Sequence, residues 1–95
     1  MDTLEHLKSV EALCDKCLRN IFVVRREDMG ALSALCEKKI SLPKGSKKSS
    51  LLLARRYRRS ATLIRILLNS ESEISMIQPK IGALKKIIRL LIQNL

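Results

Sequence analysis

Aromatic residues and chain-breaking residues are scarce in this sequence. Among 95 residues there are no Trp, one Phe, one Tyr, three Gly and two Pro. A fold with many tight turns uses Gly and Pro freely, so their scarcity argues against a many-stranded β domain. Aliphatic side chains must form the core, because 46% of the residues are apolar and so few are aromatic. We therefore expect long helices in a single domain that spans residues 1–95.

Long apolar runs are also missing. The longest have four residues, such as 21–24, whereas a bilayer span needs about 20. Asp2 and Glu5 stand where a secretory signal would have a basic region, and no apolar stretch follows them. The three cysteines make an odd number without a disulfide framework. These features favour a reducing intracellular compartment, nucleus or cytoplasm.

Motifs for catalysis are absent as well. The chain has one histidine, His6, and no Gly-rich phosphate loop, nucleophile motif or paired carboxylates. We expect neither enzymatic activity nor a cofactor. Cys14, Cys17, Cys36 and His6 would together offer four zinc ligands. Cys14 and Cys17 fall on a helical apolar stripe, however, and no second closely spaced Cys/His pair exists, so we expect buried thiols and no metal.

Apolar residues recur at helical spacing along most of the chain. The pattern predicts helices over about 2–24, 26–39, 50–68 and 79–94, with a short helix before Pro79. Asp2 with Glu5, and Ser70 with Glu73, have the spacing of helix N-caps, and Pro79 is expected to begin the last helix. The fold class is all-α, a small antiparallel bundle of four or five helices. The predicted core comprises Leu7, Val10, Cys14, Cys17, Leu32, Leu35, Leu53, Tyr57, Ile64, Leu84, Ile88 and Leu91.

Negative charge is missing from most of the second half. Residues 1–40 carry seven basic and seven acidic side chains, whereas residues 41–95 carry twelve basic and two acidic ones and hold the whole net charge of +10. Lys44 to Arg65 includes eight positive charges and no negative one. These positive side chains repel one another, and such a cluster indicates an anionic partner. Residues 41–50, with Pro43, Gly45 and several Ser and Lys, form a flexible basic loop in this interpretation.

Four arginines are the main candidates for binding that partner. The arginine cluster, Arg55, Arg56, Arg58 and Arg59, brackets Tyr57, which the helical pattern places inward. Each guanidinium can form two parallel hydrogen bonds to one phosphate. The secondary candidates are Lys44, Lys47, Lys48, Lys85 and Lys86. We therefore predict a non-enzymatic module that contacts nucleic-acid phosphates. The shortage of aromatic rings argues against base stacking on single strands and leaves backbone recognition of a duplex or structured RNA.

Other partners fit parts of the same pattern. The chain could be a protein–protein module or a small subunit of a larger assembly. Aliphatic faces of the helix at 79–94 or of the helix at 2–24 would then dock a partner helix, and the basic half would meet an acidic patch on that partner. The segment 79–94 has an apolar stripe and a basic face, which suits a core helix or a contact between copies. Membrane-surface binding is less well supported there, because Trp and Phe are missing. Lys47–Arg59 also loosely resembles a bipartite nuclear address. The sequence does not distinguish DNA, RNA and an acidic protein as partner.

Overall fold

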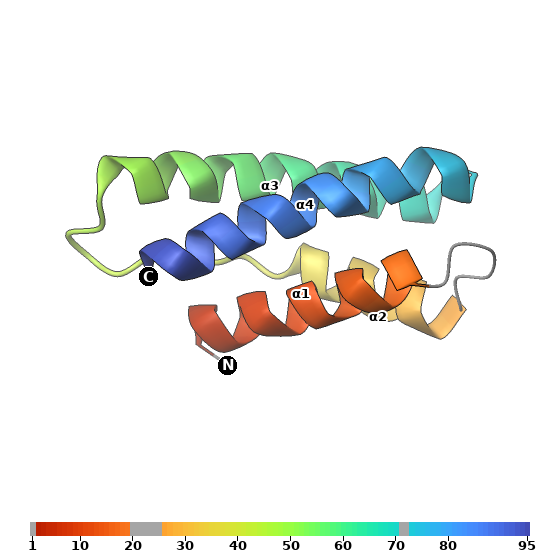
Figure 1. Cartoon of the computed structure of the whole chain (residues 1–95), viewed down its shortest axis with the longest axis horizontal. Coiled ribbons are helices and arrows are strands. Elements are labelled where there is room, and N and C mark those ends of the chain that lie inside the picture. The colour runs from red at the N-terminus through yellow and green to blue at the C-terminus, as the bar shows by residue number, and fades with distance from the viewer. Residues whose placement is uncertain (1, 20–25, 71–72) are drawn as a thin grey trace.

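The chain folds as an antiparallel bundle of α-helices (Figure 1). The computed structural model describes residues 2–19, 26–70 and 73–95, and these contain no strand. The helices are α1 (Thr3–Arg19), α2 (Arg26–Glu37), α3 (Lys48–Asn69) and α4 (Ile74–Asn94). The predicted fold class is thus confirmed, and the described ranges contain four helices.

The helices pack as a closed ring of neighbours. α1 contacts α2 and α4, and α3 also contacts α2 and α4. Figure 1 shows α3 and α4 side by side above α1 and α2, with the first turn of α1 and the last turn of α4 at the same end. The bundle measures 42 × 19 × 18 Å. Its elongated shape leaves one long face of each helix open to solvent.

Local signals set several helix ends as predicted. The Glu5 backbone N–H donates to Asp2 Oδ1 at 2.8 Å, so Asp2 is the N-cap of α1. Glu27 and Asp28 lie in the first turn of α2, where carboxylates suit the helix dipole. This helix, predicted to end at about Lys39, ends two residues earlier, at Glu37. The predicted extension of the first helix to Val24 lies outside the described residues.

The basic loop contains a defined turn. Gly45 has φ of 80°, and the Ser46 N–H donates to the Pro43 carbonyl at 3.3 Å. These features match a type II turn, in which the third residue needs a positive φ and is therefore usually Gly. The Thr3 hydroxyl donates to the Ser41 carbonyl at 2.7 Å and ties the start of the loop to α1. α3 begins at Lys48, two residues before the predicted start at Ser50.

The predicted break at Pro79 is wrong, because α4 runs through it as one helix. Pro79 removes one N–H from the helix ladder, which costs about 3 kcal/mol in a helix interior. Ile77 and Ile81, on either side, are both buried, and each contributes about 1.5–3 kcal/mol. A continuous helix keeps both on one stripe. The Ser75 carbonyl, which loses its partner, belongs to an exposed residue and can be hydrated.

Two roles are predicted for Ser70, the end of the helix at 50–68 and the N-cap of a helix that follows. The first is confirmed, because the Ser70 hydroxyl donates backwards to the Ile66 carbonyl at 2.7 Å; the second is wrong, because α4 begins after Glu73. Ser70 therefore closes the C-terminal end of α3. Glu73 is the residue that precedes α4, and it makes no side-chain capping bond. Ser70 and Glu73 therefore mark the ends of two different helices: Ser70 is the C-cap of α3, and Glu73 is the N-cap of α4.

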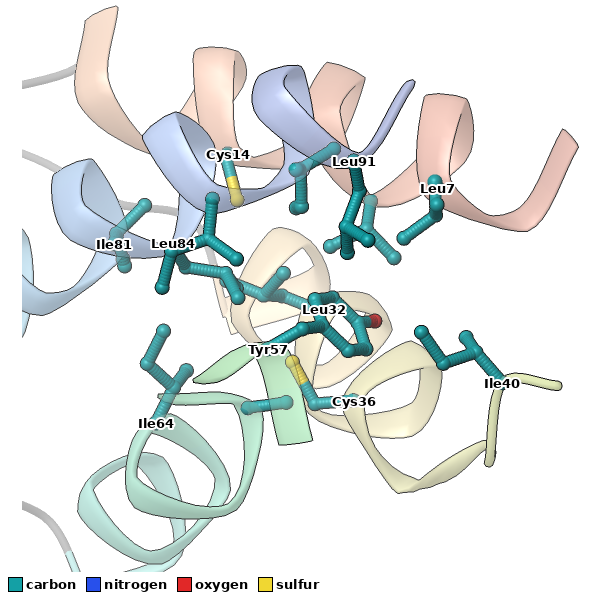
Figure 2. Packing of buried hydrophobic residues seen from close by; sticks show 14 of the residues in the cluster. Leu7, Cys14, Leu32, Cys36, Ile40, Tyr57, Ile64, Ile81, Leu84 and Leu91 are labelled. Atoms are coloured by element: carbon teal, nitrogen blue, oxygen red, sulfur yellow. The ribbon is translucent and has the colours of Figure 1, made fainter. Parts of the chain in front are cut away.

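A single aliphatic cluster fills the interior (Figure 2). Ten of the twelve predicted core residues are buried, while Leu35 and Leu53 are partly buried and pack against the cluster. The structure adds residues that the predicted list left out: Cys36, Ile40, Ala54, Ala61, Ile77, Ile81 and Ile87. Ala54 and Ala61 flank Tyr57 on α3. Their small side chains leave room for the Tyr57 ring in the middle of the bundle.

Two buried polar side chains meet across the bundle. His6 of α1 is 5% exposed, and its Nε2 lies 3.5 Å from the hydroxyl of Tyr57 on α3. Burial lowers the pKa of His6, and the nearby Lys38 ammonium lowers it further, while the backbone of Leu35 opposes both effects. The neutral imidazole is therefore the form that the folded state favours.

Core packing predicts unequal costs for two neighbouring leucines of α4. Leu91 is fully buried, whereas Leu90 is 43% exposed. Leu91→Ala should lower the free energy of unfolding by about 2–4 kcal/mol through lost burial and a new cavity. Leu90→Ala should cost less than about 1 kcal/mol. Urea unfolding followed by circular dichroism measures both, and equal costs would contradict this rotation of α4.

Burial of His6 predicts acid sensitivity near neutral pH. The folded-state pKa is lowered from the ordinary 6.5, so the unfolded chain binds the proton more readily. Stability should be full above about pH 6.5 and fall as the pH drops below it. Because His6 is the only histidine, His6→Gln should remove this dependence between about pH 7 and 5.5. A wild-type unfolding free energy that stays constant over this interval would count against the buried neutral imidazole.

Candidate nucleic-acid interface

The rotation of α3 directs the arginine cluster outward. Tyr57 is 1% exposed, and its ring lies in the centre of the core (Figure 2). Neighbours one and two positions away on an α-helix are turned from it by roughly 100° and 200°. These are the positions of Arg55, Arg56, Arg58 and Arg59, and all four are exposed. The sequence-based placement of this cluster around an inward Tyr57 agrees with the structure.

Carboxylates do not neutralise the cluster within the described part of the chain. The ion pairs found there are Lys85 with Asp15, and Arg89 with Glu11 at 3.7 Å. Both join α4 to α1, and neither involves α3. Acidic side chains of α1 thus compensate basic ones of α4. The four guanidinium groups of the arginine cluster remain exposed to solvent.

Three lysines extend the positive surface to the start of α3. Lys44 lies within the turn of the basic loop, Lys47 is the N-cap of α3 and Lys48 is its first residue. All three are exposed. The first turn of α3 contains no acidic residue, and its N-cap makes no side-chain hydrogen bond. The positive end of the helix dipole therefore adds to the lysine charges.

The two candidate lysines of α4 have different surroundings. Lys86 is exposed, whereas Lys85 is half-buried and ion-paired with Asp15. A phosphate would have to compete with that carboxylate for Lys85. Arg65 also stands apart from the cluster, since it is half-buried and its charge acts on Cys36. The strongest concentration of uncompensated charge therefore comprises the arginine cluster with Lys44, Lys47 and Lys48.

The cysteines lie in the core. Cys14, Cys17 and Cys36 are free thiols and are buried, as the helical stripes predicted. Burial raises the pKa of Cys14 to about 12 and that of Cys36 to about 11, and it also raises the pKa of Cys17. In the described ranges, no group of three or more His, Cys, Asp or Glu is arranged to hold a metal ion.

Exposed aliphatic residues on α3 are the feature that the charge analysis missed. Leu51, Leu52, Leu63 and Ile66 are 39–55% exposed. Leu63 and Ile66 line a shallow hollow together with Thr62, Arg58 and Arg59. The inward stripe accounts for the core, and arginines are prominent among the outer positions of the same helix. Their apolar content was visible in the sequence as residues two positions away from the core stripe.

Comparison with known proteins identifies no relative. No family model matches the sequence, and neither a curated protein nor a solved structure is significantly similar to it. Across the described segments, none of the helices combines the length and hydropathy that a membrane span requires. The function must therefore be inferred from the geometry of this chain itself.

Thiol burial predicts low reactivity in the folded protein. With pKa values raised by burial, Cys14, Cys17 and Cys36 hold very little thiolate, the nucleophilic form, at about pH 8. A disulfide reagent such as dithionitrobenzoate should label the native chain slowly and all three thiols quickly in denaturant. Equally rapid labelling of the native chain would show that the thiols are not enclosed as described.

Proposed function

We propose that this chain is a non-enzymatic module that binds nucleic-acid phosphates through α3 and the basic loop. The observation that supports it best is the outward arginine cluster, which no carboxylate of the described residues neutralises. Four guanidinium groups on little more than one helical turn repel one another. A phosphate backbone, with one negative charge about every 1.7 Å of duplex axis, relieves that repulsion.

The form of the surface favours contacts to the backbone over base stacking. Tyr57 is buried, so α3 presents no aromatic ring to a base. Arginine and lysine contacts to phosphates fix position on a duplex without selecting its sequence. The proposed ligand is therefore a DNA duplex or a folded RNA, bound with little sequence preference. Free thiols in the core fit a reducing compartment, where such ligands are found.

Salt dependence is the direct test of this function. For each phosphate neutralised, the slope of log K against log salt steepens by about 0.9 on a duplex. Replacing all four arginines of the cluster with Gln should therefore reduce the slope by about 3.6 and weaken binding at low salt by at least about a hundredfold. Fluorescence anisotropy with a labelled DNA duplex and an RNA hairpin measures both quantities.

A control variant of equal charge separates local contacts from overall charge. Lys8, Lys16, Arg19 and Arg26 are exposed and belong to the neutral half of the chain. Changing these four to Gln removes the same charge and should leave the affinity within about threefold of the wild type. Equal losses in the two variants would mean that net charge alone drives binding. A flat salt response, with binding retained after the cluster is replaced, would eliminate the proposal.

A further inference from the structure

α3 carries a second stripe on the side opposite the core. Its inward stripe runs through Ser50, Ala54, Tyr57, Ala61, Ile64 and Leu68, in steps of four and three residues. The outer seam, Leu52, Arg56, Arg59, Leu63 and Ile66, repeats the same steps two residues later, and every member is exposed. Alternating steps of four and three keep a row of side chains facing one neighbouring helix. The outer seam therefore has the pattern of a helix contact, and no helix among the described residues covers it.

The apolar members of the seam are not explained by the fold or by phosphate binding. Leu52 is 55% exposed, Ile66 is 54% exposed and Leu63 is 39% exposed. A leucine or isoleucine gains nothing from a phosphate, and exposing it to water is unfavourable. Leu63 and Ile66 also form one edge of the shallow hollow beside Arg58 and Arg59. These side chains would gain stability only from an apolar partner.

We propose that the outer seam docks an amphipathic helix of a partner protein that carries aliphatic residues at both ends and carboxylates in the middle. The aliphatic residues would cover Leu52 at one end and Leu63 with Ile66 at the other. The carboxylates would face Arg56 and Arg59, and each guanidinium can donate two parallel hydrogen bonds to one carboxylate. Leu52 and Ile66 are 14 positions apart, so the seam is about 21 Å long and suits a partner segment of about four helical turns.

Charge complementarity decides between this occupant and two others. In a second copy of this chain, full overlap of the two seams would place Arg59 against Arg59 in either direction, and like charges at a close contact are unfavourable. An anionic membrane would need a continuous apolar face to insert. Here Arg56 and Arg59 interrupt the apolar row, so only its ends could enter the bilayer. An acid-bearing helix matches both the apolar ends and the cationic centre.

Docking of such a helix goes beyond nucleic-acid binding but shares part of its surface. Arg56 and Arg59 belong both to the outer seam and to the arginine cluster. A helix on the seam would therefore exclude a duplex from the same face. The aliphatic residues belong to the seam alone, which lets the two ligands be distinguished by mutation.

The test uses a labelled helical peptide and the full chain. The peptide carries Leu at the outer positions of two heptads and Glu at the central ones, and a scrambled peptide has the same composition. Leu52→Gln/Leu63→Gln/Ile66→Gln should weaken binding of the helical peptide by at least about tenfold, because the apolar contacts are lost. It should leave duplex binding within about twofold, because all arginines remain.

A matched variant keeps the result specific to the seam. Leu51, Met76 and Leu90 are exposed to a similar degree, at 52%, 58% and 43%, but lie off the seam. Changing these three to Gln should leave peptide affinity within about twofold, and thermal melts of both variants establish that the fold is retained. The proposal would be overturned if the scrambled peptide bound as tightly as the helical one, or if the seam variant bound the helical peptide as tightly as the wild type. It would also be overturned if the chain bound anionic lipid vesicles through the seam in place of the peptide. None of these outcomes would alter the salt test of duplex binding.

Discussion

Burial of the Tyr57 ring between the helices fixes the rotation of α3, and the exposed surface of the molecule follows from it. The ring is the largest side chain in the core, and the small side chains of Ala54 and Ala61, about one turn away on either side, are buried on the same helix. Turning α3 enough to bring the adjacent Arg56 or Arg58 inward would expose the ring and bury a guanidinium without a partner, which is far more costly than losing one apolar contact. The same constraint therefore builds the core and orients the arginine cluster.

Electrostatic compensation is uneven around the bundle. On the α1–α4 side, Lys85 pairs with Asp15 and Arg89 lies near Glu11, so opposite charges meet within the chain. On α3 the described residues provide no such carboxylate. Exposed ion pairs contribute little to stability, so this asymmetry matters less for folding than for binding. It concentrates uncompensated positive charge on the face formed by α3.

Local patterns predicted the parts of this structure that depend on neighbouring residues in sequence. The burial of Cys14 and Cys17 follows from the apolar spacing around them, and the N-cap at Asp2 depends on the first turn of the helix. Both features are set within one or two helical turns, so the sequence could predict them. Pro79 could not be placed correctly, because its local preference opposes the burial of Ile77 and Ile81 against other helices. Tertiary packing decided in favour of one long helix.

The candidate site also combines features that local sequence patterns predict with features that depend on tertiary packing. The outward direction of the arginine cluster follows from its neighbours around Tyr57. The pairing of Lys85 with Asp15 depends on α1 and α4 lying side by side, which no short-range pattern specifies. The aliphatic residues of the outer seam were present in the sequence at regular spacing. Only the structure shows that no described helix covers them.

The most direct measurement of the central claim is a nuclear magnetic resonance titration of the isotope-labelled chain with a short DNA duplex. The account predicts that the side-chain Nε–H signals of Arg55, Arg56, Arg58 and Arg59 shift together, along with backbone signals of the basic loop, while Tyr57 and the core signals hold their positions. Shifts confined to α1 and α4, or no shift at low salt, would contradict it.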